Sequence, residues 1–197
     1  MTAKTILVVE DESSVTKLYV QFLQPEYTVL TAETAQEGID ILLGEEPTAD
    51  ASAAAIDAVL LDRRLPDAPG EAVLDCIEDN GFDCRVAMVT GVEPDFDIVD
   101  MGFDLYIVKP VTRSELLEAV ETLFVRSEYG GLLQEAASLA SKRALLESQK
   151  SAAELNASEE YSTLLDRMSE LDDELLDLAD SLSSDDYRVM FRDLGNA

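Results

Sequence analysis

The chain has 197 residues, of which 47% are hydrophobic, so it can bury a core and is too apolar to be wholly disordered. With 42 acidic and 14 basic residues its formal net charge is −28, and a phosphate backbone or an anionic lipid surface would be repelled. Histidine is absent, which excludes histidine acid–base catalysis and the usual zinc sites. No apolar run in the sequence is long enough to cross a bilayer, so we expect a cytoplasmic protein with no membrane partner.

The acidic residues are spread along the whole chain. Residues 1–125 hold 26 of them, and residues 126–197 hold the other 16. A surface of this kind keeps a protein dissolved where salt screens the repulsion between carboxylates. We therefore expect a halophilic source.

Residues 1–125 alternate short apolar runs with amphipathic stretches. The first run, Thr5–Val9, is too short and too β-branched for a helix and is typical of a buried parallel strand. Repeated strand–helix units predict an α/β fold with a doubly wound, five-stranded parallel sheet, which binds ligands at the carboxyl ends of its strands. The expected strands are 5–9, 27–30, 58–61, 85–89 and 105–108.

Capping residues predict where several helices begin. Ser13 or Ser14 would cap the first helix, Thr34 the second, and Thr112 with Glu115 the last helix of this region. The remaining expectations are a helix after the turn at 66–70, a short fourth helix at 95–101 and a surface insertion at 46–55.

The pattern changes after residue 125, where no strand signal remains. Helices are expected over 132–155 and again after a capping box formed by Asn156 and Glu159. The second helix carries an apolar seam at alternating spacings of three and four: Tyr161, Leu164, Met168, Leu171, Leu175, Leu178 and Leu182. This seam predicts an α-helical hairpin, which we prefer to a coiled-coil homodimer because the chain can supply the partner helix itself. A last short helix is expected from residue 183.

Five polar residues lie where predicted strands end: Glu10, Asp11, Asp62, Thr90 and Lys109. A single acid at such a place is usually a turn or cap residue, but this many on one edge is not expected by chance. Carboxylates that meet at close range repel one another unless a cation joins them, and hard oxygen ligands suit Mg²⁺. A carboxylate beside the ion can attack a phosphoryl group whose charge the lysine and the hydroxyl stabilise.

A series of short motifs runs through residues 1–125 in a fixed order: 6–12, 59–62, 65–67 with Gly70, Thr90, and Tyr106 three residues before Lys109. In order and spacing they resemble the CheY-like receiver domain of response regulators, whose fold is flavodoxin-like. The resemblance covers residues 1–125, which we take as the first domain.

The resemblance implies roles for individual residues. Asp62 would be phosphorylated by the phosphohistidine of a sensor histidine kinase, in a reaction that needs Mg²⁺. Thr90 would bond to a phosphoryl oxygen, Lys109 would pair with it, and Tyr106 would be the switch aromatic that turns inward as Thr90 moves. The implied metal ligands are Asp11, Asp62, the backbone carbonyl of Arg64 and, through water, Glu10.

Residues from about 130 to 190 resemble HalX, a helical region attached to receivers in haloarchaeal proteins. The resemblance rests on residues 143–147 and on the seam from Tyr161 to Leu182. The name HalX implies no biochemical activity. We take residues 126–197 as a HalX-like output domain.

The sequence thus predicts a response regulator of a His-Asp phosphorelay that signals through its helical region to an unidentified output protein. It would not be an enzyme beyond slow self-catalysed phosphorylation and dephosphorylation. One alternative is a DNA-binding transcription regulator, which a net charge of −9 over residues 126–197 disfavours. Another is a phosphatase or hydrolase with Asp62 as nucleophile, which would need an acid where Arg64 stands. Arg63 and Arg64 would either shield the acyl phosphate or face solvent.

Overall fold

The computed structural model describes residues 4–44 and 56–181. The expected insertion at 46–55, the helix from 183 and the end of the seam at Leu182 lie outside the described residues. None of the helices within these ranges combines the length and the apolar composition needed to cross a bilayer.

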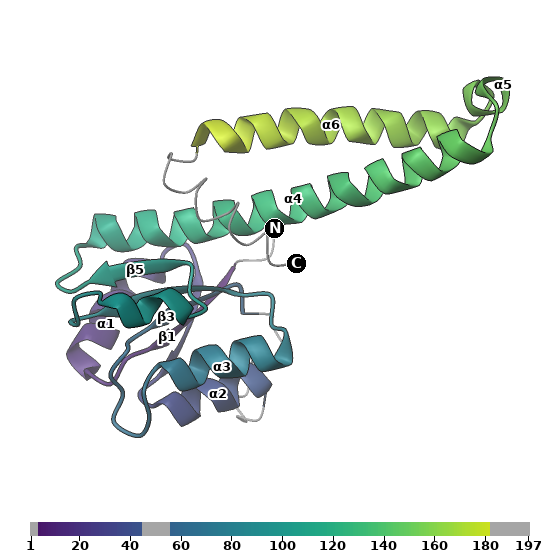
Figure 1. Cartoon of the computed structure of the whole chain (residues 1–197). Helices are drawn as coiled ribbons and strands as arrows, with labels where there is room; N and C mark the ends of the chain where they lie inside the picture. Colours follow the sequence, from purple (N-terminus) through teal and green to yellow (C-terminus); the bar gives the residue numbers. More distant parts are fainter. Residues whose placement is uncertain (1–3, 45–55, 182–197) are drawn as a thin grey trace. The chain divides into compact units, whose positions relative to one another are not determined.

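Five parallel strands form one sheet in the order β2-β1-β3-β4-β5 (Figure 1). The doubly wound α/β prediction is confirmed, and each expected strand lies within two residues of an observed one. The strands are β1 (Thr5–Val9), β2 (Thr28–Ala32), β3 (Ala58–Leu61), β4 (Arg85–Thr90) and β5 (Leu105–Val108). Every residue of β1 and β3 is buried, because these two strands lie inside the sheet and helices cover both of its faces.

Helices cover the two faces of the sheet through separate apolar clusters. On one face, Ile6 and Val8 pack with side chains of α1 (Ser13–Leu23) and of the first turns of α4 (Arg113–Gln149). On the other, Leu7 and Val9 pack with α2 (Ala35–Leu43) and α3 (Glu71–Asn80), which lie together in Figure 1. This division follows from the two-residue period of a strand, which sends alternate side chains to opposite faces.

Two of the predicted helix starts are confirmed. Thr34 accepts a hydrogen bond from the backbone N–H of Glu37 and so caps α2. At the start of α4, Thr112 Oγ1 accepts from the N–H of Glu115, whose carboxylate accepts from the N–H of Thr112 at 2.8 Å. The second pair is a capping box, in which each residue satisfies a backbone donor of the other.

The predicted cap of α1 is wrong. Glu12 occupies the capping position, and no side chain caps the helix. The two serines are used elsewhere, because Ser13 donates its hydroxyl to Glu33 and Ser14 donates to Glu12. Neighbouring carboxylates therefore take the hydroxyls that the sequence assigned to the helix end.

The expected fourth helix is a single short 3₁₀ helix, η1 (Phe96–Asp100). Asp95 begins it by accepting a hydrogen bond from the N–H of Phe96 at 2.7 Å. Phe96 is 91% exposed and Val99 67% exposed, so η1 adds almost no side chain to the core. With so little apolar surface to bury, the segment does not extend into a regular α-helix.

The chain divides into two compact units, residues 1–124 and 125–197. In the second unit α4 continues without a break to Gln149, past Gly130 and Gly131, where the sequence predicted a separate helix from residue 132. A glycine costs a helix only about 1 kcal/mol relative to alanine, so the pair weakens the helix without ending it.

The predicted capping box at Asn156 and Glu159 is wrong as well. The structure has one at Ser151 and Glu154, which begins α5 (Ala152–Asn156). The next helix, α6 (Glu159–Ser181), begins after Ser158, whose hydroxyl oxygen accepts from the N–H of Tyr161 at 3.1 Å. The capping box lies earlier than predicted because the connection between α4 and α6 holds an extra short helix, α5.

Within the second unit, α6 runs back along α4 and forms the predicted helical hairpin (Figure 1). Arg167 donates to both carboxylate oxygens of Glu135 at 2.8 and 2.9 Å, and Tyr161 donates to Glu147 at 2.8 Å. A bidentate pair of this kind fixes which turns of the two helices face each other. Leu171 of the seam is fully buried, whereas Leu176, outside the seam, is 66% exposed.

Candidate phosphoacceptor site

The five polar residues predicted from the strand ends meet at one edge of the sheet. Glu10 and Asp11 follow β1, Asp62 follows β3, Thr90 ends β4, and Lys109 follows β5. Because the strands are parallel, their carboxyl ends open on the same side. The edge forms a pocket of about 640 Å³, lined by Glu10, Asp11, Glu12, Ser13, Asp62, Arg64, Thr90, Gly91, Val92 and Lys109.

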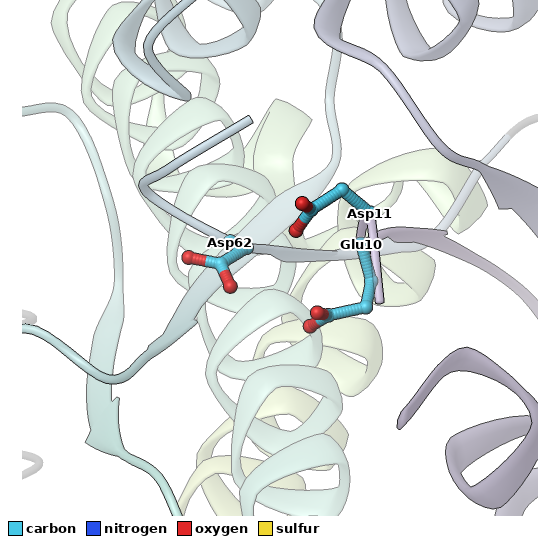
Figure 2. Close-up of side chains that lie close together, drawn as sticks. All are labelled: Glu10, Asp11 and Asp62. Atoms are coloured by element: carbon cyan, nitrogen blue, oxygen red, sulfur yellow. The ribbon is translucent and has the colours of Figure 1, made fainter. Parts of the chain in front are cut away.

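Three carboxylates converge in this pocket. Glu10, Asp11 and Asp62 each offer an oxygen atom, and these atoms lie within 4.8 Å of one another (Figure 2). Glu10 and Asp62 are buried, whereas Asp11 is exposed. Burial raises the pKa of Glu10 above its usual value, although its hydrogen bond with Lys109 acts in the opposite direction. Two of the three carboxylates thus lie where water screens charge poorly.

Lys109 supplies the opposite charge. Its ammonium group donates to Glu10 Oε2 and to Asp62 Oδ2, both at 2.5 Å. Burial disfavours the charged form of Lys109, but the hydrogen bonds with Asp62 and Glu10 outweigh it, so the pKa of Lys109 is raised. The lysine therefore stays protonated and holds one oxygen of Asp62 in a fixed position.

The other oxygen of Asp62 is held by the backbone. The N–H of Arg64 donates to Asp62 Oδ1 at 3.0 Å, and the exposed Arg64 side chain lines the pocket. The role of the Arg64 carbonyl as a metal ligand stays a prediction. Arg63 does not line the pocket; its side chain is turned toward Glu71 and Asp97 instead.

Thr90 and Tyr106 are joined through the backbone of Val92. Thr90 is buried, and its Oγ1 accepts from the N–H of Val92 at 3.4 Å. The Tyr106 hydroxyl donates to the carbonyl of Val92 at 2.9 Å, and its ring lies 5.5 Å from that of Phe103. Tyr106 is half-buried beside the pocket without lining it, so its role as a switch stays a prediction.

The donor set fits Mg²⁺. Carboxylate oxygens are the hard ligands that this ion prefers, and three of them lie close enough together to share one cation. Lys109 neutralises only part of their charge, which leaves a net negative pocket among the described residues. Asp11 is exposed, so it can bind an ion that keeps several of its waters.

Gly70 and Asp67, which belong to the motif that follows Asp62, shape the site through their contacts. A Cβ atom on Gly70 would lie 2.5 Å from the carbonyl oxygen of Asp62, so only glycine fits there. Asp67 accepts from the N–H groups of Ala35 and Gln36, both at 2.9 Å, and so ties the loop after Asp62 to the start of α2. The expectation that Arg63 shields the acyl phosphate or faces solvent is wrong, because its side chain does not line the pocket and is only 15% exposed. No sequence signal pointed to its partner Asp97.

Family models match both parts of the chain. The response regulator receiver domain matches residues 6–121, and the HalX domain matches residues 125–191. A Haloferax volcanii protein named as a transcriptional regulator is 41% identical over 165 residues, which is 84% of this chain and 27% of that protein. The transcriptional regulatory protein PhoP of Bacillus subtilis is 31% identical over 64% of this chain and 50% of its own length. The chain thus spans about a quarter to a half of these relatives.

Solved structures agree with the fold. A CheY-like receiver domain protein of Methanospirillum hungatei has a TM-score of 0.55 and 28% identity, and the match covers 64% of this chain and 98% of that one. The response regulator TrrA of Thermotoga maritima, solved in complex with Mg(2+)-BeF, has a TM-score of 0.51 and 29% identity over 61% of this chain and 98% of its own.

Proposed function

Because the chain belongs to the response regulator receiver family and carries a HalX domain, we propose that it accepts a phosphoryl group on Asp62 from a sensor histidine kinase. The observation that carries this proposal is the convergence of three carboxylates and Lys109 around one nucleophile. Both oxygens of Asp62 are held in place, one by the N–H of Arg64 and the other by Lys109.

Each residue of the pocket has a separate role in phosphoryl transfer. An oxygen of Asp62 attacks the phosphorus, and the bond from phosphorus to the donor's nitrogen breaks. Lys109 then stands beside the oxygens of the transferred group, and the Thr90 hydroxyl donates to one of them. Asp11, Asp62, the carbonyl of Arg64 and, through water, Glu10 would hold Mg²⁺, which supplies charge neutralisation at the phosphoryl oxygens.

Magnesium dependence tests the ligand set. We expect a small acyl phosphate to phosphorylate the wild type only when Mg²⁺ is present, and Asp11→Asn to lose at least tenfold in rate because it lacks a ligand. Asp79→Asn, which removes an exposed acid of α3, is the matched control and should react normally. Equal rates in Asp11→Asn and the wild type would remove Asp11 from the metal site.

The same geometry supports a phosphoacceptor and not a hydrolase. A hydrolase with this nucleophile needs a general acid–base near Asp62, and the position two residues on holds Arg64 in place of a carboxylic acid. We infer that the chain releases its phosphoryl group slowly and turns over no other substrate. The cytoplasmic location expected from the sequence stays a prediction.

We assign the output to contact with another protein through the helical unit. A groove of about 580 Å³ lies at the turn of the hairpin, and Leu145 in it is 64% exposed. Four leucines and a tyrosine dominate the groove, while its two lysines are balanced by two glutamates: Lys142, Leu145, Leu146, Lys150, Glu154, Leu155, Ser158, Glu160, Tyr161 and Leu164. Apolar contact with balanced charge is typical of a protein partner.

DNA binding is the competing output, and the names of the two relatives favour it. The described helices of the second unit form an acidic hairpin and present no basic recognition helix. We expect the phosphorylated chain to bind no duplex DNA with sequence preference in molar KCl. A specific gel shift at that salt would replace the protein-contact proposal with DNA binding.

A further inference from the structure

Arg63 follows the candidate phosphoacceptor directly in the chain and ties two further elements together. Its Nε donates to Glu71 of α3 at 3.1 Å, and its Nη2 pairs with Asp97 of η1. Only 15% of the side chain is exposed. The ion pair with Asp97 is the main cause that raises the pKa of Arg63, and the hydroxyl of Tyr106 contributes. The guanidinium group therefore lies between α3, η1 and β5.

Most of the described side chains of η1 are exposed. Phe96, Asp97 and Val99 are exposed, and Ile98 is only half-buried, so none of its described side chains reaches the core. A single 3₁₀ turn has no stability of its own in water. Among the side chains of residues 96–99, Asp97 is the one that forms an ion pair with another element.

Two contacts of the connection from β4 to β5 lead to the pocket. Near its start, Tyr106 holds the carbonyl of Val92, and the N–H of Val92 donates to Thr90. At η1, Asp97 is held by the residue next to Asp62. A change in the pocket can therefore reach η1 through the backbone of residues 62–64.

We propose that Arg63 transmits phosphorylation of Asp62 to η1, an inference that rests on the proposed function. In the unmodified chain, the Asp62 side chain accepts from the N–H of Arg64 at 3.0 Å and fixes the backbone on both sides of Arg63. Once Asp62 becomes an acyl phosphate, its carboxyl oxygens no longer carry the full charge and accept more weakly. The backbone at Arg63 relaxes, its pair with Asp97 loosens, and η1 with its exposed Phe96 is released.

Hydrogen exchange of the full chain, followed by mass spectrometry in molar KCl, tests this link. The wild type, Asp97→Asn and Glu71→Gln are compared with and without acetyl phosphate and Mg²⁺. Without the donor, Asp97→Asn should exchange about two- to fivefold faster than the wild type over residues 94–101, as expected for the loss of one ion pair. Phosphorylation should speed the same amides in the wild type and add nothing in Asp97→Asn.

Glu71→Gln is the matched control, because it removes the other partner of Arg63 and leaves the pair with Asp97 intact. It should respond to phosphorylation as the wild type does. The link is overturned if Asp97→Asn exchanges at the wild-type rate without the donor, or if its η1 still responds when Asp62 is phosphorylated. If the wild type takes up no phosphoryl group, the proposed function fails and the link fails with it, whereas full uptake with an unresponsive η1 refutes the link alone.

Discussion

The loop that follows Asp62 is fixed by two residues with different physical tasks. Gly70 lies where a Cβ atom would come within 2.5 Å of the carbonyl of Asp62 and 3.2 Å of the Cα of Arg63. Its φ of −57° suits any residue, so the requirement is for space and not for backbone freedom. Asp67 holds the same loop from the other side, through the first N–H groups of α2.

We expect Gly70→Ala to lower the free energy of unfolding by about 1–3 kcal/mol, because the added methyl group must displace the backbone of Asp62. Phosphorylation should slow as well, since the nucleophile moves. Guanidinium chloride titration measures the first effect and a phosphorylation time course the second. Gly131→Ala is the control: nothing lies within 4 Å of its Cβ position on α4, so it should stabilise its unit by about 1 kcal/mol. Wild-type stability and rate in Gly70→Ala would disprove the steric argument.

The lowered pKa of Asp67 predicts that the stability of the fold depends on pH. Hydrogen bonds from the N–H groups of Gln36 and Ala35 lower its pKa below 3.8 in the folded chain. The ionised Asp67 carboxylate therefore contributes its full stabilisation of the fold above about pH 5. This stabilisation is lost as the pH falls through the folded-state pKa. Denaturation midpoints of the wild type and Asp67→Asn should differ most at neutral pH and converge toward pH 3. A difference that stays constant over this range would show that the carboxylate charge is not involved.

At the scale of helices, the buried seam of α6 predicts that substitutions at two leucines of this helix differ sharply in their effect on stability. Leu171→Asp places an unpaired charge at a fully buried position and should unfold the second unit. Leu176→Asp, five residues along the same helix, changes a side chain that is 66% exposed and should shift stability by less than about 0.5 kcal/mol. Circular dichroism measures the helix content, and Asp62 phosphorylation should survive both changes. Equal loss of helix in the two variants would refute the hairpin seam.

Sequence reasoning worked where the signal is local and periodic. Residues 58–61 and 105–108 were predicted as strands because they are short apolar runs, and the pocket followed because polar residues end such runs. Predictions were wrong where other contacts compete with the local pattern. Ser13 does not cap α1 because its hydroxyl donates to Glu33, and Gly130 does not interrupt α4. The pair between Arg63 and Asp97 was out of reach, because two residues 34 positions apart carry no signal that they meet.

For the whole molecule, we expect a net charge of −28 to make folding depend on salt. Compaction brings carboxylates together, and dissolved ions screen their repulsion. The denaturation midpoint should rise steeply from dilute buffer to molar KCl. Sodium chloride should raise the denaturation midpoint as much as KCl does at equal ionic strength. Sucrose added to dilute buffer should not reproduce this rise. Equal stability in dilute buffer and in molar KCl would contradict the halophilic interpretation.

The central claim is that Asp62 alone accepts the phosphoryl group, and mapping the modified residue tests it most directly. After incubation with acetyl phosphate and Mg²⁺, the wild type should carry one phosphoryl group, sensitive to hydroxylamine as an acyl phosphate is, in the peptide that contains Asp62. Asp62→Asn should carry none. A label that maps to another peptide, or that persists in Asp62→Asn, would contradict the account.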